Sequence, residues 1–274
     1  MKRLPLSKRR PKPDFIRAIW YEMARKFCGI LIWIFYRPIV IGSENVPHFG
    51  PVLIAANHQS YLDPPLVCFY YQRQSAFVAR AGLFKSRIFG FMLRNLNSTP
   101  IKEQGGDTAA IKEVLRRLGE GWPIVIFPEG SRCFDGAMQP FKRGISLLVK
   151  MSKAPVVPAA LEGCFDCFPR NGKPRFYWRG PRIALKYGKP IPYEELMKDG
   201  QDAALARLQD EIDKVRLELR AMLRARNADH YPPAGLGDLP VRRSDPRRAP
   251  QDPTAPAPTT PVASASADAS RTDS

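Results

Sequence analysis

The chain contains 274 residues, of which 44% are hydrophobic and 25% are charged. This composition excludes a wholly disordered chain, a coiled coil and a collagen, and the length predicts one or two globular domains. Forty-three Lys and Arg against 26 Asp and Glu leave a formal net charge of +17, which indicates an anionic partner: a phosphate, a nucleic acid or an anionic membrane surface. The five Cys are too few for a disulfide-dense scaffold, and their odd number favours reduced thiols in the cytosol.

Residues 1–37 are predicted to form a basic amphipathic region that binds a membrane. Residues 1–26 hold nine Lys or Arg and only two acidic residues. The uncharged run 27–36 is too short as a helix to cross a bilayer core of about 30 Å, so we expect a helix lying in the headgroup plane. A helix that packs against the core instead remains an alternative. Apolar residues at spacings of three and four predict one stripe along this helix: Phe15, Ile16, Ile19, Trp20, Met23, Phe27, Ile30, Leu31 and Ile34.

Residues 38–230 are predicted to form one α/β domain with a mixed or mostly parallel sheet flanked by helices, because short apolar runs alternate with helical patterns. The expected strands are Ile39–Ile41, Val52–Ala56, Ala76–Ala79, Ile124–Phe127, Val156–Leu161 and Ile183–Tyr187. The expected helices are Thr108–Leu118, Gly144–Lys150 and Asp202–Arg226.

Residues 231–274 are predicted to be a disordered tail. They contain nine Pro together with many Ala, Ser and Thr and few large apolar side chains. Such a segment cannot bury enough surface to offset the entropy of ordering it. We expect a dispensable extension, with recruitment of a partner as the alternative.

The first chemically informative motif follows the Val52–Ala56 run and contains His58 and Asp63. Loops after strands commonly carry the active groups of α/β proteins. A neutral imidazole accepts a proton near pH 7, and a neighbouring carboxylate fixes its tautomer. We expect Asp63 to cap the helix that Pro64 begins and so to lie close to His58. Spacing alone favours a structural histidine and a plain helix cap.

The second motif, Phe127-Pro128-Glu129-Gly130-Ser131-Arg132, also follows an apolar run. Gly130 allows a close backbone approach, Ser131 offers a hydroxyl, and Arg132 offers a guanidinium fork that suits phosphate. Lys142 and Arg143 add two cations before the next expected helix. The alternative is an ordinary turn with a surface arginine.

Together these motifs resemble the lysophosphatidate acyltransferase family of glycerolipid acyltransferases. Residues 57–63 match that family's His-x4-Asp block, and residues 127–132 match its Phe-Pro-Glu-Gly block about 70 residues later. The Gly90–Lys102 region and Val156–Ala159 resemble the second and fourth blocks. Two positions depart from the pattern: Lys102 stands where the family commonly has Arg, and Ser131 stands where it often has Thr.

The resemblance implies transfer of a fatty acyl group from an acyl thioester to the sn-2 hydroxyl of lysophosphatidate, which gives phosphatidate. His58 would be the base and Asp63 would orient it, while Lys102, Glu129, Gly130, Ser131 and Arg132 would hold the acceptor phosphate and its loop. Backbone N–H groups near His58 or Gly130 are candidate donors to the oxyanion. No metal or cofactor is expected, and the co-substrate is acyl-CoA or acyl-acyl carrier protein. The expected location is the cytoplasmic face of the cell membrane, with peripheral or monotopic attachment.

Other function classes leave more unexplained. The same chemistry on another lysolipid or glycerophosphate-type acceptor remains the alternative among enzymes. A membrane scaffold does not require these motifs, and a nucleic-acid-binding protein would explain the charge, but none of its usual motifs is found. Cys164 and Cys167 have the spacing of a metal-binding pair but lack a second pair.

Overall fold

The computed structural model describes residues 11, 13–101, 106–177 and 182–241. Within these residues, seven strands form one sheet in the order β1-β7-β6-β2-β5-β3-β4. The neighbours β6-β2-β5-β3-β4 are all parallel, whereas β7 is antiparallel to β6 and parallel to β1. This confirms the expected mixed, mostly parallel sheet. The strands are β1 (Ile39–Ile41), β2 (Val52–Ala56), β3 (Ala76–Arg80), β4 (Ser98–Ile101), β5 (Pro123–Ile126), β6 (Val156–Glu162) and β7 (Ala184–Tyr187).

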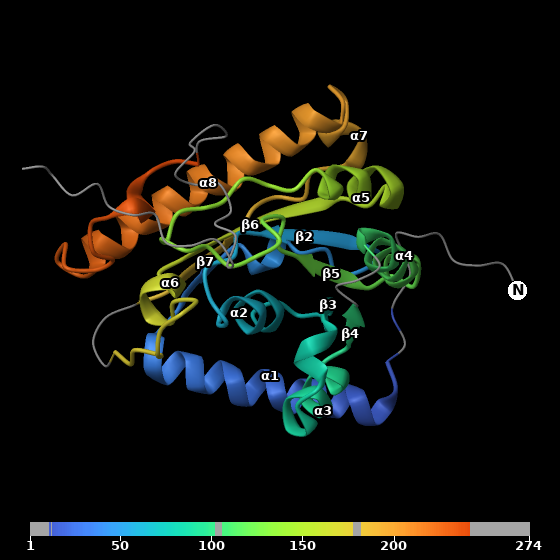
Figure 1. The fold of residues 1–274 in the computed structure, drawn as a ribbon, viewed down its shortest axis with the longest axis horizontal. Coiled ribbons are helices and arrows are strands. Elements are labelled where there is room, and N and C mark those ends of the chain that lie inside the picture. Colours follow the sequence, from blue (N-terminus) through green and yellow to red (C-terminus); the bar gives the residue numbers. More distant parts are fainter. Residues whose placement is uncertain (1–10, 12, 102–105, 178–181, 242–274) are drawn as a thin grey trace, which may run out of the picture. The chain divides into compact units, whose positions relative to one another are not determined.

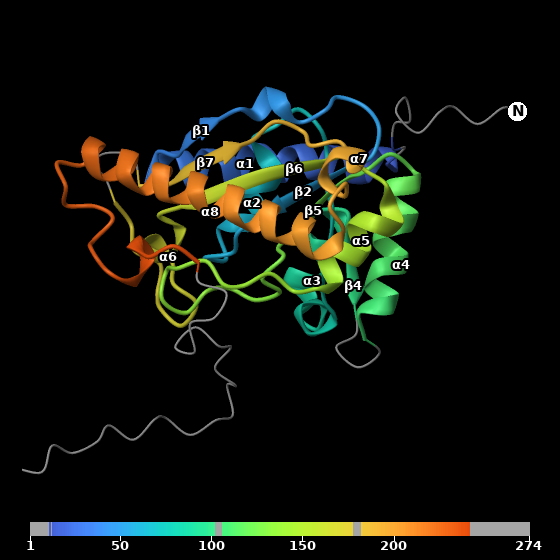
Figure 2. The same ribbon diagram turned by 90° about the horizontal axis from the view of Figure 1, so that it is seen from above.

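Helices cover both faces of the sheet. Figure 1 shows α8 and α5 on one side and α1, α2 and α3 on the other. In the view turned by 90°, α8 runs along the sheet beside β6 (Figure 2). The α-helices are α1 (Phe15–Tyr36), α2 (Asp63–Phe69), α3 (Arg87–Asn95), α4 (Gly106–Gly119), α5 (Gly144–Ser152), α6 (Cys164–Cys167), α7 (Tyr193–Leu196) and α8 (Gln201–Arg226).

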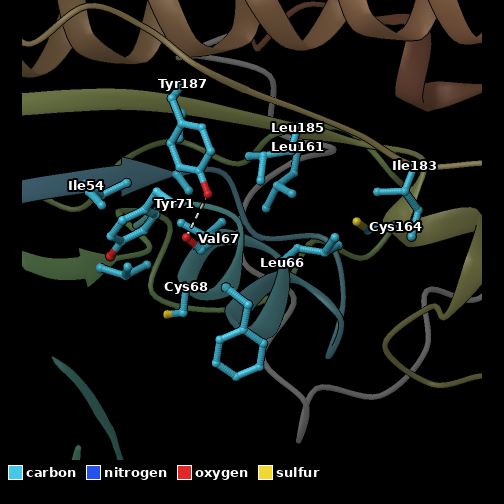
Figure 3. Close-up of a cluster of buried hydrophobic side chains, with 14 of the residues drawn as sticks. Ile54, Leu66, Val67, Cys68, Tyr71, Leu161, Cys164, Ile183, Leu185 and Tyr187 are labelled. Atoms are coloured by element: carbon cyan, nitrogen blue, oxygen red, sulfur yellow. Dashed lines mark hydrogen bonds between the residues drawn. The ribbon is translucent and has the colours of Figure 1, made fainter. Parts of the chain in front are cut away.

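The central strand β2 is buried on both faces, which explains its unbroken apolar sequence. Its side chains alternate between two cores. Ile54 faces α1 and α2, in a cluster with residues of β6 and β7 (Figure 3). Leu53 faces α4, α5 and α8. In the first cluster, the Tyr187 hydroxyl donates to the Val67 carbonyl over 2.8 Å and so attaches α2 to the sheet.

Helix α1 turns its apolar stripe away from the protein. Its contacts with the domain come from a different face: Tyr21 is fully buried, its hydroxyl donates to the Cys68 carbonyl over 3.3 Å, and it accepts from the Ser75 N–H over 3.0 Å. Every member of the predicted stripe is exposed, from 38% at Leu31 to 77% at Phe15. Nowhere in the described ranges is a helix both long enough and apolar enough to cross a membrane.

The beginning of the segment expected to be disordered is folded. Tyr231 is buried in the first core cluster, and its hydroxyl donates to the Gly163 carbonyl over 2.8 Å. Arg216 of α8 donates to the carbonyls of Gly237 (2.6 Å) and Leu239 (3.0 Å). The prediction of disorder from residue 231 is therefore wrong for residues 231–241, because backbone carbonyls bonded to buried arginines stabilise a segment that has few apolar side chains of its own. Residues 242–274 lie outside the described residues.

Candidate active site

The sheet brings the two sequence motifs together. Strands β2 and β5 are parallel neighbours, in register from Val52 with Pro123 to Ala55 with Ile126. The loops that follow them therefore leave the same edge of the sheet side by side. A backbone hydrogen bond joins the two loops, from the Cys133 N–H to the His58 carbonyl over 2.8 Å. Segments about 70 residues apart thus form one site.

His58 is held by a buried carboxylate. Its Nδ1 lies 2.8 Å from Oδ2 of Asp63. The Asp63 side chain is fully buried, while the His58 side chain keeps 17% of its surface exposed. The imidazole also stacks on Phe127, with ring centroids 4.1 Å apart. Because Nδ1 faces the carboxylate, the other nitrogen, Nε2, is the one left to accept a proton from a substrate.

Asp63 reaches this position in a way that differs from the expected helix cap. It is the first residue of α2, and Leu62 occupies the cap position without a side-chain hydrogen bond. Its Oδ2 accepts the backbone N–H groups of Gln59 (2.5 Å) and Ser60 (2.7 Å) in addition to His58. The carboxylate is therefore fixed by the loop that carries the histidine, and this fixes the imidazole orientation.

Glu129 is a buried residue that joins the two loops by hydrogen bonds. It is only 4% exposed. Its Oε1 accepts the His58 N–H over 2.6 Å, and its Oε2 accepts the Gln139 N–H over 2.8 Å. Burial raises the pKa of this carboxyl to about 8, although the two backbone hydrogen bonds oppose the shift. Glu129 therefore holds the two loops together, which is one part of its expected role, while a contact between Glu129 and the acceptor remains a prediction.

Gly130 has a conformation and a neighbour that both favour glycine. Its φ is +71°, and a Cβ there would lie 2.5 Å from Cε of Lys142. The Lys142 side chain therefore packs over this turn, and its backbone N–H donates to the Pro128 carbonyl over 2.9 Å. Lys142 and Arg143 are both exposed, but Lys142 packs over the second loop, which also holds the half-buried Ser131, whereas Arg143 is the cap residue of α5.

Arg132 lies against the loop that carries His58. Its guanidinium carbon is 3.5 Å from the ring centroid of Tyr61, and its Nη1 donates to the Arg170 carbonyl over 3.4 Å. The guanidinium and the imidazole therefore belong to one two-loop surface. Lys102, the remaining predicted ligand, lies outside the described residues.

The expected oxyanion donors are backbone N–H groups near His58 or Gly130, and the N–H groups of these two residues themselves already have partners. The His58 N–H donates to Glu129, and the Gly130 N–H donates to the Phe127 carbonyl over 2.9 Å. Neither can therefore bind an oxyanion without losing an internal bond. In the part of the chain that the structure describes, no group of three His, Cys, Asp or Glu side chains could hold a metal ion. Cys164 and Cys167 are buried free thiols.

A buried ionic network, which no sequence pattern indicated, supports the first loop. Glu162, at the end of β6, is fully buried and accepts from Arg220 Nη1 (2.6 Å), from Arg216 Nη1 (3.4 Å) and from Gln59 Nε2 (3.1 Å). Gln59 is the residue after His58, so α8 contacts the site through Glu162. The available signal was a pair of arginines four residues apart on α8, Arg216 and Arg220, whose charge alone assigns them to solvent.

Comparison with known proteins identifies this arrangement. Residues 37–162 match the family model described as Acyltransferase. This range contains both loops and ends at Glu162, so the domain is of the acyltransferase class.

The similar proteins carry names that specify the acceptor of the acyl group. The chain is 28% identical over 185 residues to the 1-acyl-sn-glycerol-3-phosphate acyltransferase of Bacillus subtilis, a match that covers 67% of this chain and 88% of the relative. It is 28% identical to the chloroplastic enzyme BAT2 of Brassica napus over 57% of this chain and 46% of the relative. The chain thus spans about half the length of the chloroplastic relatives it matches.

A solved structure gives the same result. The crystal structure of PlsC, a 1-acyl-sn-glycerophosphate acyltransferase of Thermotoga maritima, superimposes with a TM-score of 0.64 at 25% identity and covers 75% of this chain and 81% of that chain. The chain is thus similar, over the range that contains both motifs, to proteins named as lysophosphatidate acyltransferases, which its motifs resemble.

Proposed function

We propose that this protein transfers a fatty acyl group from an acyl thioester to the free sn-2 hydroxyl of lysophosphatidate and so forms phosphatidate. The observation that carries the proposal is the His58–Asp63 pair, which is joined through Glu129 and Cys133 to a loop containing Arg132. The names of the Bacillus subtilis and Thermotoga maritima relatives, both acyltransferases of 1-acylglycerophosphates, support this acceptor.

In the proposed reaction, the lipid hydroxyl attacks the thioester carbonyl while Nε2 of His58 takes its proton. Asp63 accepts the Nδ1–H bond and stabilises the imidazolium that forms. The tetrahedral intermediate then collapses, the carbon–sulfur bond breaks, and His58 returns the proton to the departing thiolate. The products are an ester and a free thiol. General-base help of this kind is typically worth about 10²–10⁴ in rate.

Direct transfer agrees with the nucleophiles at the site. The loops contain no Gly-x-Ser-x-Gly elbow, and the nearby Cys133 is fully buried, with burial raising the pKa of its thiol well above the usual value. A thiol of that kind is a poor nucleophile. The acceptor hydroxyl itself is therefore the attacking group in this mechanism.

The proposed place of action is a membrane surface, on its cytoplasmic face. The exposed stripe of α1 supports it, and Trp20 extends this surface to α3 by an edge contact with Phe91, with ring centroids 5.7 Å apart. Phe91 is itself 51% exposed. A contiguous apolar surface of this kind is costly in water and is stabilised when it enters the boundary between headgroups and acyl chains. The five free thiols support a reducing compartment.

The test is an assay of the purified full chain on vesicles that contain lysophosphatidate, supplied in parallel with acyl-CoA and with acyl-acyl carrier protein. Phosphatidate formation with either donor is expected. Glycerol 3-phosphate, lysophosphatidylcholine and monoacylglycerol serve as competing acceptors. Faster transfer to any of these than to lysophosphatidate would overturn the proposed acceptor, and transfer to none would overturn the proposed activity.

A further inference from the structure

A second arginine lies beside Arg132. Arg170 belongs to the segment after α6, and its Nη1 donates to the Arg132 carbonyl over 3.1 Å, while Arg132 Nη1 donates to the Arg170 carbonyl over 3.4 Å. The two residues therefore fix each other through reciprocal side-chain to backbone bonds. Arg170 lies beyond residue 162, where the match to the family model ends.

Aromatic rings orient both guanidinium groups. Arg132 lies 3.5 Å above the centroid of Tyr61, and Arg170 lies 4.3 Å above the centroid of Phe134. Stacking restricts the planes of the two groups, so less conformational entropy is lost when a ligand binds. The Arg170 segment is also attached to the His58 loop, since the Ser60 hydroxyl donates to the Phe168 carbonyl over 2.7 Å.

Both cations lack an acidic partner. Among the described residues, neither Arg132 nor Arg170 makes an ion pair with a carboxylate, although many other arginines do. Each group has five N–H donors and uses one for the reciprocal carbonyl bond. The reciprocal bonds hold both half-buried arginines on the same pair of segments, so an anion that meets both guanidinium groups would be neutralised by two positive charges.

We infer that Arg132 and Arg170 form a clamp for a phosphate monoester, and that this group is the phosphate of the acceptor lipid. The assignment of the ligand rests on the proposed function. A monoester carries a charge of about −1.5 to −2 at pH 7 and presents three oxygens, which suits two guanidinium forks. In lysophosphatidate only about four bonds separate the reacting oxygen from phosphorus, so the phosphate must bind near His58. The clamp satisfies this, because Cys133, next to Arg132, is bonded to the His58 carbonyl.

The test compares Arg170→Gln with the wild type. Glutamine keeps hydrogen-bond donors but removes the charge. The KM for lysophosphatidate is expected to rise about 10- to 100-fold, the loss expected for one charge-assisted hydrogen bond, while the KM for the acyl donor stays unchanged. Arg170→Lys is expected to recover part of the loss because it restores a point charge. Lys173→Gln is the matched control, since Lys173 is an exposed cation on the same segment, and it is expected to leave both KM values unchanged.

A binding measurement separates this inference from the proposed activity. Calorimetry with sn-glycerol 3-phosphate, a soluble phosphate monoester, requires no turnover, and Arg170→Gln is expected to weaken its binding about tenfold or more. If the wild type forms no phosphatidate but binds glycerol 3-phosphate through Arg170, the clamp stands and the proposed function fails. Equal binding by the wild type and Arg170→Gln would overturn the clamp. If Arg170→Gln raises only the KM for the acyl donor, the clamp does not bind the acceptor. If Lys173→Gln has an equal effect, the general positive charge of the surface, and not a clamp, explains the result.

Discussion

Replacing Asp63 with Asn tests how the carboxylate controls His58. In the wild type, Oδ2 of Asp63 accepts three N–H groups, from His58 Nδ1 (2.8 Å), Gln59 (2.5 Å) and Ser60 (2.7 Å). An amide has one oxygen and one NH2 group. Because all three N–H groups meet the same oxygen, an amide oxygen in that place can keep the three bonds. It carries no negative charge, however, so it cannot stabilise the imidazolium that forms when His58 takes the proton of the substrate.

The expected loss in kcat is about 10²–10⁴-fold, equivalent to about 2.7–5.5 kcal/mol, because the imidazolium loses the negative charge beside it and general-base catalysis weakens. The KM values are expected to stay within about threefold, since Asp63 is fully buried and touches no substrate. Asn retains most of the backbone hydrogen bonds but loses their charge assistance. We therefore expect the free energy of unfolding to fall by about 2–4 kcal/mol.

The assay is steady-state phosphatidate formation at a temperature well below the melting point of the variant. Asp135→Asn is the control, because among the described residues the Asp135 carboxylate accepts one N–H group, that of Ala137 (3.0 Å), a bond that an amide oxygen can also accept. That variant is expected to keep kcat within about twofold. A loss smaller than tenfold in Asp63→Asn would refute the proposal that the charge of Asp63 stabilises the protonated base.

Three further results are expected. Glu129→Gln should flatten the pH dependence of stability. Its pKa is raised from 4.5 to about 8, so between those values the native wild type binds more protons than the unfolded chain. Its free energy of unfolding should therefore fall as pH rises through this window, by at most about 1.4 kcal/mol per pH unit, and its melting temperature should fall with it. Glu162→Ala should destabilise the fold by about 3–5 kcal/mol in urea unfolding, because it leaves Arg216 and a second buried arginine without their shared carboxylate, and a loss under 1 kcal/mol would contradict the network. Ile30→Glu, on the exposed stripe of α1, should weaken co-flotation with anionic vesicles, whereas Met151→Glu on α5, similarly exposed, should not; equal flotation of both would contradict the membrane-binding face.

The sequence was sufficient to predict the central strands and the meeting of the two motifs. The run Val52–Ala56 is apolar at every position, as expected for a parallel strand covered on both faces. Each motif directly follows such a run. Parallel strands end at the same edge of a sheet. Because β2 and β5 are neighbours, the loops that carry His58 and Arg132 begin side by side at that edge. The order of the strands itself depends on long-range pairing, which no local pattern encodes.

The missed features all depend on partners that are distant in the sequence. The stripe on α1 was predicted correctly, but its outward direction is set by Tyr21, whose hydroxyl bonds to residues near α2. Arg216 looks like a solvent-facing residue in a periodic helix, yet it is fully buried because Glu162 and the carbonyl of Gly237 bind it. The same bonds explain why a proline-rich segment is folded up to Val241. Local composition contains none of this information.

The most direct test of the account is to compare two histidine variants in the phosphatidate assay. His58→Ala removes the proposed base, whereas His48→Ala removes an exposed histidine at a distance from both loops in sequence. We expect His58→Ala to lower kcat by at least about 10²-fold and to retain the binding of glycerol 3-phosphate. We expect His48→Ala to keep the kcat of the wild type. A folded His58→Ala variant that forms phosphatidate at the rate of the wild type would contradict the central claim.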